Sequence, residues 1–417
     1  MEAAEDLRAA SLSVLAALVS AHCGWAVSRQ AVGERLNDGF GKLMEWLVGL
    51  GLGDVYRTLG GAQGGVFAAF GRILVEDSTV VSLPPHLAER WPGARNQSGK
   101  RQAAMKLQTL LELRTDSLVR IRRSPFTRND QAAAADILEE LRPGDLVLRD
   151  LGYFVLPVFG RIAAMGAYFL SRLHSGTVVL DPATGERLEL LKLLRGRETL
   201  DLDVLLGCGE RLPVRLVACR VPPDVAEERR REAGANSDRR CKPSASKLAL
   251  LDWELFVTNV PRTVWSTRIA VQVYGLRWRI EILFKAWKSH LHLAALHAEA
   301  SDIQAECLIL ARLLHAIRFQ SSTWQVVRYT LAQHGRQASL LKTARLLTGP
   351  NGARLREALQ GRADLLADIL IRHCAHDRRR RISYAQAIEH YMSVPGEPFD
   401  VALLVCAQPG DLQVVTP

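Results

Sequence analysis

Four polar side chains recur at helical spacing in the C-terminal half of the chain: Tyr274, Arg277, Glu281 and Lys288. Their separations of three, four and seven residues return to one face of an α-helix, within an arc of about 60° if each residue turns the helix by about 100°. Apolar residues at helical spacing mark a different face, by which the helix would pack. A carboxylate that can hold a metal ion, next to two cations and a phenol that can hold phosphates, indicates chemistry on a nucleic-acid backbone.

The glutamate needs partners, because two-metal catalysis requires several carboxylates that converge from different elements. Asp77 lies in a predicted strand, and Asp150 ends the apolar run 145–150. Either aspartate alone is more often a turn former or a helix cap. If the two lie on neighbouring strands, however, and the helix that carries Glu281 follows them, the three carboxylates would complete a metal site. Their oxygens are hard ligands that suit Mg²⁺ or Mn²⁺. Strand alternation puts Glu76 on the opposite face, outside this site.

The elements that would carry these acids follow from changes in periodicity. Alternation over 72–80 predicts a strand, and further strands are expected at 106–113 and 118–123. A capped helix over 130–141, ended by a Pro-Gly pair, precedes the strand that ends at Asp150. Three strands, a helix and a fourth strand is the order in which an RNase H-like domain begins.

The rest of the chain is interpreted more coarsely. Short β-like runs fill the region up to about 250, sheet resumes at 255–259, and helix follows from about 266. Ser28 is the expected N-cap of a short helix, which would be either the second helix of a DNA-binding helix-turn-helix or an ordinary surface helix. We therefore predict five regions: helical 1–70, a first core segment 71–160, a β-rich insertion 161–250, a second core segment 251–330 with the polar helix, and helical 331–417.

Composition is compatible with this interpretation without proving it. The 417 residues carry a net charge of +10 and the pI is near 9.5, which favours a polyanionic partner such as nucleic acid. The seven cysteines are scattered and form no C-x-x-C pair, so we expect reduced thiols in a cytoplasmic protein. No apolar stretch has the length of a membrane span, and acidic residues precede the first apolar run where a secretory leader needs positive charge.

Taken together, these motifs resemble a known family, the insertion-sequence-four family of bacterial DDE transposases with its Y-x2-R-x3-E-x6-K signature. Tyr274, Arg277, Glu281 and Lys288 meet that signature without a gap, Asp77-Ser-Thr resembles the first catalytic motif and Asp150-Leu-Gly-Tyr-Phe the second. The segment 257–261 (Val-Thr-Asn-Val-Pro) resembles the strand that returns the chain to the core. The resemblance implies an α/β fold with an RNase H-like, retroviral-integrase-like core, interrupted by a mostly β insertion domain and flanked by helical terminal regions.

The resemblance also implies roles. Asp77, Asp150 and Glu281 would hold two Mg²⁺ ions, for which Mn²⁺ can substitute. Tyr274 and Arg277 would hold phosphates near the cleaved end, and Lys288 would hold the backbone further along; a solvated helix face is the alternative for the two cations. The partners would be double-stranded DNA, both terminal inverted repeats and target, and a second copy of the chain on that DNA, in the nucleoid of a bacterial cytoplasm.

Several alternatives stay open. Trp265 and Trp278 could stack on a flipped base, although packing in the core or at a domain interface is the stronger expectation for both. The basic runs Arg229–Arg231, Arg239–Arg240 and Arg378–Arg381 are either phosphate contacts or ordinary surface. Two rival functions are a nuclease that cuts without joining and a DNA-binding protein that does neither.

Overall fold

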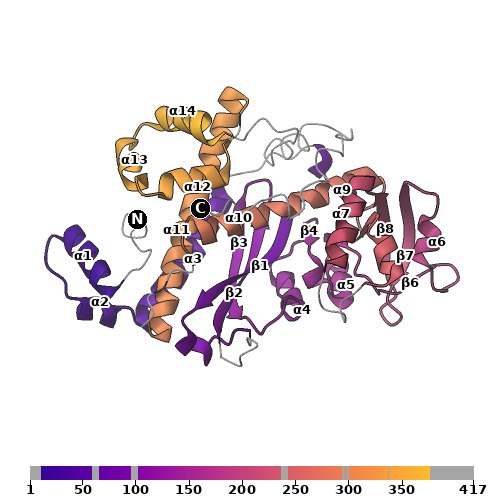
Figure 1. The fold of residues 1–417 in the computed structure, drawn as a ribbon, viewed down its shortest axis with the longest axis horizontal. Helices are drawn as coiled ribbons and strands as arrows, with labels where there is room; N and C mark the ends of the chain where they lie inside the picture. The colour runs from indigo at the N-terminus through magenta and orange to yellow at the C-terminus, as the bar shows by residue number, and fades with distance from the viewer. Residues whose placement is uncertain are drawn as a thin grey trace. The chain divides into compact units, whose positions relative to one another are not determined.

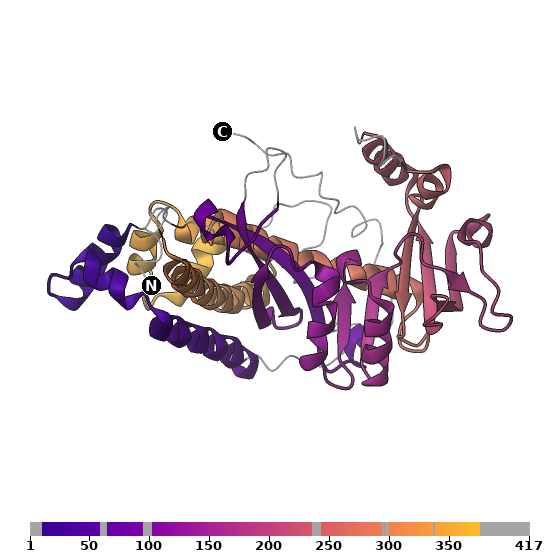
Figure 2. The ribbon, with the colours of Figure 1, turned by 90° about the horizontal axis from the view of Figure 1, so that it is seen from below.

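The structure is a computed structural model. It describes residues 11–58, 65–94, 102–235, 243–293, 296, 300–336 and 338–375. These residues form two compact units, and each unit is built from separate stretches of the chain. The first unit contains the described residues of 1–61, 77–129 and 279–375, and the second those of 62–76 and 130–278. Figure 1 and Figure 2 show the elements of both units in two orientations.

The second unit is built on a sheet with the strand order β1-β4-β5-β9-β8-β7-β6. β4 is parallel to both β1 and β5, and the remaining pairs are antiparallel. All four residues of β4 are buried, as expected for a parallel strand covered on both faces. The strands are β1 (Ile73–Leu83, of which 73–76 lie in this unit), β4 (Leu146–Arg149), β5 (Tyr168–Arg172), β6 (Val179–Leu180), β7 (Thr199–Leu206), β8 (Leu212–Arg220) and β9 (Trp253–Thr258).

The predicted insertion does not form a sheet of its own. Its strands β5 and β8 pair with β4 and β9 respectively, so β5 to β8 extend the same sheet. The boundaries of the two compact units fall at other places in the chain than those of the five predicted regions. The division into five regions therefore remains a prediction. The helices of the second unit are α4 (Asp130–Ala133), α5 (Leu156–Ala164), α6 (Leu190–Leu194), α7 (Pro223–Gly234), α8 (Ala245–Leu250) and α9 (Thr267–Tyr274).

The helix predicted over 130–141 is wrong in part. Only Asp130–Ala133 is α-helical, and Ala134–Glu139 continues as a 3₁₀-helix. The carbonyl of Ala134 accepts a hydrogen bond of 2.7 Å from the buried guanidinium of Arg149. The Arg149 side chain comes from β4 and not from the helix itself. The helical periodicity of 130–141 therefore could not predict its contact with Ala134.

The first unit contains helices and a sheet of strand order β3-β2-β1, in which β2 and β3 form a hairpin. The predicted strands near 106–113 and 118–123 are confirmed as β2 (Ala103–Glu112) and β3 (Ser117–Pro125), which pair antiparallel. Ser28 is confirmed as an N-cap, since its hydroxyl accepts a 3.1 Å hydrogen bond from the amide of Ala31. The helices are α1 (Leu12–Cys23), α2 (Arg29–Arg35), α3 (Asp38–Thr58), α10 (Trp278–Ser289, from 279 in this unit), α11 (Asp302–His334), α12 (Leu340–Thr348), α13 (Gly352–Ala358) and α14 (Ala363–Cys374).

No described helix combines the length and the apolar character that a bilayer span requires.

Candidate metal and nucleic-acid site

Asp150 is positioned by the parallel pairing of β1 and β4. In this register Ile73 lies opposite Leu146 and Glu76 lies opposite Arg149, so Asp150 is the first residue beyond the paired segment of β4. Its backbone is still extended, with φ −77° and ψ 163°, and its side chain is 40% exposed. A partly exposed carboxylate at the carboxyl end of a parallel strand can bind a cation or a polar ligand.

A buried ion pair lies one residue before this point. Arg149 donates from Nη2 to Oε2 of Glu76 over 2.6 Å, and neither side chain has any exposed surface. The guanidinium also lies over the rings of Tyr153 and Phe159, at 5.2 and 5.8 Å from their centres. Glu76 is therefore engaged inside the protein while Asp77 is half-exposed, the difference that strand alternation predicted.

Two of the predicted signature residues lie near Asp150 in the second unit. Nε of Arg277 is 3.9 Å from Oδ1 of Asp150, and the Arg277 guanidinium lies 6.0 Å from the centre of the Tyr274 ring. The Tyr274 hydroxyl donates a 3.3 Å hydrogen bond to the carbonyl of Arg149. Burial raises the pKa of Tyr274 to about 12, although Arg277 and Arg172 oppose the shift. The phenol therefore stays protonated at neutral pH.

The signature does not lie on one continuous α-helix, contrary to the sequence prediction. α9 ends at Tyr274, Gly275–Arg277 forms a 3₁₀ turn, and α10 begins at Trp278. Since a 3₁₀-helix has about 3.0 residues per turn, the arc calculated for a regular α-helix does not apply across this turn.

The first unit holds the other three predicted residues. Asp77 is half-exposed in β1, and its Oδ1 accepts a 2.7 Å hydrogen bond from the amide of Ser78. Glu281, in the first turn of α10, is half-exposed, and Lys288 is exposed in the last turn. Partial removal from solvent lowers the pKa of Lys288. The residues predicted for the apolar face, Leu276, Ile280, Leu283, Trp287 and Leu291, are all buried, although Leu276 precedes α10 and Leu291 follows it.

The donor chemistry of the three carboxylates fits a divalent cation. Asp77, Asp150 and Glu281 offer hard oxygen ligands of the kind that Mg²⁺ prefers, and all three keep some solvent access. Asp77 and Glu281 belong to the first unit and Asp150 to the second, so neither unit alone contains all three. Within the described ranges, no three His, Cys, Asp or Glu side chains are grouped as a metal site.

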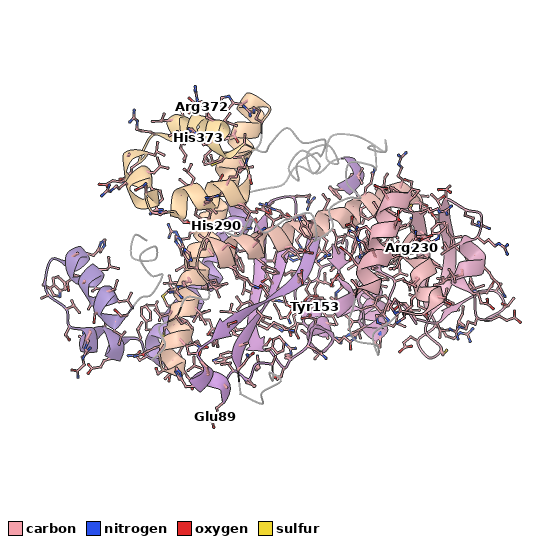
Figure 3. The ribbon with its side chains drawn as sticks, in the orientation of Figure 1. Glu89, Tyr153, Arg230, His290, Arg372 and His373 are labelled. Carbon is pink, nitrogen blue, oxygen red and sulfur yellow. The ribbon has the colours of Figure 1, made fainter. Side chains whose placement is uncertain are left out.

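The other predicted contacts have varied outcomes. Trp265 is fully buried and its Nε1 donates to the carbonyl of Val66 over 2.8 Å, which confirms core packing; Trp278 is half-buried. Arg229, Arg230 and Arg231 of α7 pair with Glu254, Asp252 and Glu228, so acids already neutralise this run; Figure 3 labels Arg230. Arg239–Arg240 and Arg378–Arg381 lie outside the described residues.

Sequence reasoning missed one cation beside Tyr274. Arg172 ends β5, its side chain is 45% exposed, and its guanidinium lies 5.6 Å from the centre of the Tyr274 ring. The same side chain is 3.8 Å from Glu254. Its position at a strand end, the feature that identified Asp150, was the signal available for finding it.

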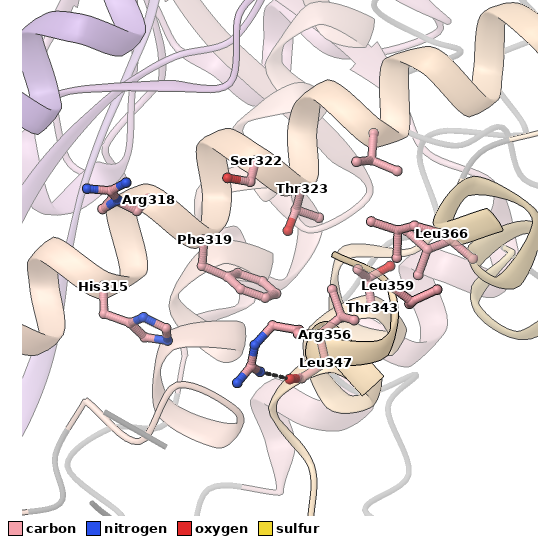
Figure 4. A pocket seen from close by; sticks show the side chains of 12 residues that line it. His315, Arg318, Phe319, Ser322, Thr323, Thr343, Leu347, Arg356, Leu359 and Leu366 are labelled. Atoms are coloured by element: carbon pink, nitrogen blue, oxygen red, sulfur yellow. Dashed lines mark hydrogen bonds between the residues drawn. The ribbon is translucent and has the colours of Figure 1, made fainter. Parts of the chain in front are cut away.

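A separate cavity of about 240 Å³ lies among α11, α12, α13 and α14 of the first unit. Figure 4 shows its lining, in which Arg356 donates a hydrogen bond to the carbonyl of Leu347. His315 of α11 points toward the same space, and its buried Nδ1 has no hydrogen-bond partner among the described residues. Burial, reinforced by the charge of Arg356, lowers the pKa of His315 to about 4, so the imidazole is neutral at pH 7.

In the second unit, a mixed sheet carries Asp150 just beyond the end of β4, with the Arg277 guanidinium beside it, a setting typical of enzymes that act on nucleic acid. The family model described as "Transposase DDE domain" matches residues 68–317. The chain belongs to this family of DDE transposases, enzymes that act on DNA in insertion-sequence transposition.

Curated relatives support the assignment. The chain is 27% identical over 325 residues to the transposase for insertion sequence element IS231B of Bacillus thuringiensis subsp. berliner, covering 73% of this chain and 67% of that protein. It is 29% identical over 298 residues to the IS231D transposase of Bacillus thuringiensis subsp. finitimus, covering 66% and 61%. The IS1151 transposase of Clostridium perfringens is 25% identical over 304 residues, covering 68% and 64%. The chain thus spans about two thirds of the length of these relatives.

Proposed function

We propose that this chain cleaves the ends of its insertion sequence and joins them to target DNA, using Asp77, Asp150 and Glu281 as the ligands of two Mg²⁺ ions. The strand register carries the proposal: Glu76 and Arg149 lie opposite each other, Asp77 follows Glu76 within β1, and Asp150 follows Arg149 just beyond the end of β4. Glu281 is the fourth residue of α10, in the stretch of chain that follows Arg277. The β1-β4-β5 segment with β4 parallel to both neighbours supports an RNase H-like core.

The chain's own residues would bind and orient the DNA. Arg277, close to Asp150, offers a planar fork that suits a phosphate, and Arg172 adds a second cation around Tyr274. Lys288, which is exposed at the far end of α10, would hold the backbone beyond the cleaved bond. When bound, divalent ions activate the attacking oxygen and stabilise the leaving oxygen.

Tyr274 is proposed to orient the DNA end and not to attack phosphorus. Its phenol is buried, its hydroxyl donates to a main-chain carbonyl, and its pKa is raised to about 12. A nucleophilic tyrosine needs an accessible phenolate, which this environment opposes. Water is the first nucleophile in the proposed reaction, and the freed 3′-hydroxyl is the second.

The helical ends of the chain have proposed roles of their own. The helices within 1–70 would help bind the terminal inverted repeats, and those within 331–417 would contact a second copy of the chain on DNA. Deletion of residues 1–36, which contain α1 and α2 and leave Val66 and Phe67 of the second unit in place, should abolish binding that is specific for the repeats while metal-dependent nicking continues. Loss of nicking together with binding would contradict this division of roles.

The central test uses the full chain and a labelled duplex that carries the terminal repeats of its own element. Nicking and joining should require Mg²⁺ or Mn²⁺, stop with EDTA, and stop in Asp77→Asn, Asp150→Asn and Glu281→Gln. The exposed Asp224→Asn in the first turn of α7 is a matched control that should stay active. Cutting without joining would instead support a nuclease, and specific binding without cutting in either metal would support a DNA-binding regulator.

A further inference from the structure

A buried contact joins the tip of the β2–β3 hairpin to the start of α10. Asp116 lies in this turn with φ 54°, in the left-handed region that residues other than glycine seldom adopt. Its carboxylate accepts two hydrogen bonds from Arg279, from Nε over 2.7 Å and from Nη2 over 2.5 Å. Both side chains are buried, with 1% of Asp116 and 8% of Arg279 exposed. A two-point pair of this kind fixes orientation as well as distance.

The turn that holds Asp116 is itself held from two other directions. Nε2 of Gln320, on α11, donates to the main-chain carbonyl of Asp116 over 2.7 Å. Within the turn, the Glu112 carboxylate accepts hydrogen bonds from the amide and the hydroxyl of Thr115, over 2.8 and 2.7 Å, and from Nε of Arg114 over 3.0 Å. The Asp116 carboxylate is therefore a fixed point against which α10 is held.

The position of Arg279 gives this contact a consequence for Glu281. Arg279 is the second residue of α10 and Glu281 is the fourth, so about 3 Å of rise and about 200° of rotation separate them. The two side chains thus leave the helix on nearly opposite sides. Holding the Arg279 side chain in a two-point pair sets the rotation of the first turn, and with it the direction in which Glu281 points.

We propose that Asp116 is a positioning residue for Glu281 and acts through Arg279. The proposal rests on the proposed function, in which Glu281 is a metal ligand. Asp116 itself touches neither metal nor DNA, because it is buried and its carboxylate is bound to Arg279. Replacing a residue that orients a metal ligand through a hydrogen bond or an ion pair typically lowers metal affinity by about 10-fold to 100-fold.

The test measures Mn²⁺ binding to the full chain by the electron paramagnetic resonance of free Mn²⁺, without DNA. Asp116→Asn should raise the half-saturating Mn²⁺ concentration about 10-fold. Arg279→Lys keeps the charge but loses the planar fork, and it should shift the concentration in the same direction. Arg90→Lys, which alters an exposed pair with Glu306 in the same unit, should leave Mn²⁺ binding unchanged.

A general loss of stability is distinguished by a core variant. Leu313→Ala on α11 removes buried packing but leaves the Asp116, Arg279 and Glu281 side chains unaltered, so it should lower the melting temperature but keep the Mn²⁺ affinity. The proposal would be overturned if Asp116→Asn or Arg279→Lys bound Mn²⁺ as tightly as the wild type does. It would also be overturned if Leu313→Ala lost as much Mn²⁺ affinity as those two variants. Equal Mn²⁺ binding by wild type and Glu281→Gln would remove the proposed metal site itself, and the inference with it.

Discussion

Glu76 and Arg149 face each other across the parallel pair β1 and β4, joined by a 2.6 Å hydrogen bond that is closed to solvent. Each is followed in the chain by an aspartate that we propose as a metal ligand. The pair therefore fixes the register of two strands at the point where they lead into the proposed site. Nε and Nη1 of Arg149 have no hydrogen-bond partner among the described residues, so the guanidinium depends on Glu76, on the Ala134 carbonyl and on two aromatic rings.

Removing one member of this pair should be costly. Glu76→Ala would leave the Arg149 charge buried without its counter-ion, and we expect the free energy of unfolding to fall by about 3–5 kcal/mol. The double variant Glu76→Leu with Arg149→Met should lose less than the sum of the single variants, because it removes both charges. Urea unfolding of the wild type, Glu76→Leu, Arg149→Met and the double variant gives the coupling, and additive losses would contradict a direct interaction.

Lys288 and Lys285 form a natural comparison on α10, since both are exposed and only Lys288 belongs to the signature. Lys288→Ala should weaken binding to duplexes that carry the terminal repeats and reduce the salt slope of log K by about 1, because one phosphate contact is lost. Lys285→Ala should have little effect on either quantity. Fluorescence anisotropy at several salt concentrations measures both, and equal effects of the two variants would point to general charge attraction.

The Tyr274 hydroxyl offers a test that separates stability from DNA binding. Tyr274→Phe removes a 3.3 Å hydrogen bond to the Arg149 carbonyl, which should cost about 0.5–1.5 kcal/mol of stability. Because the folded pKa of about 12 is above the ordinary value of 10.0, unfolding favours deprotonation, and the tyrosine's contribution to stability should be lost as the pH rises from 10 to 12. Ultraviolet titration should show one fewer tyrosine with a raised pKa in the variant. Unchanged nicking by Tyr274→Phe would show that the phenol isn't needed to orient DNA.

The lowered pKa of His315 predicts that the first unit becomes less stable in acid. Its pKa of about 4 in the folded protein lies below the ordinary value of 6.5, so the unfolded chain binds the proton more readily. Stability should therefore fall as the pH drops from 6.5 toward 4, by up to about 1.4 kcal/mol per pH unit from this residue. His315→Leu should flatten this part of the curve, as measured by urea unfolding at several pH values. An unchanged slope in the variant would assign the pH dependence to other groups.

Local patterns in the sequence predicted the strands of the proposed core well. Alternation over 72–80 and the apolar run before Asp150 correspond to β1 and β4, although residues 73–76 of β1 are all buried and do not alternate in exposure. The Glu76 assignment followed from the same alternation. The roles of Asp77, Asp150 and Glu281 remain predictions, since they depend on a metal and on DNA.

What the sequence did not reveal depends on contacts between distant residues. The Asp116–Arg279 pair joins positions that are 163 residues apart, and no periodicity marks it. The 3₁₀ turn at Gly275–Arg277 was missed because spacing alone assumes a regular helix. The pairing of β8 with β9 joined the predicted insertion to the main sheet, and such pairing depends on strand partners that composition cannot identify.

The order in which the chain supplies the segments of the two units determines when each unit can fold during synthesis. The second unit takes most of its residues from one continuous stretch, 130–278, whereas the first needs 279–375 to complete the helices that pack around its hairpin. Arg279, the partner of the buried Asp116, leaves the ribosome only after the described residues of the second unit have been translated. Until then the Asp116 carboxylate lacks the Arg279 partner that it has in the folded first unit, so a chain released early by the ribosome would carry an incomplete first unit.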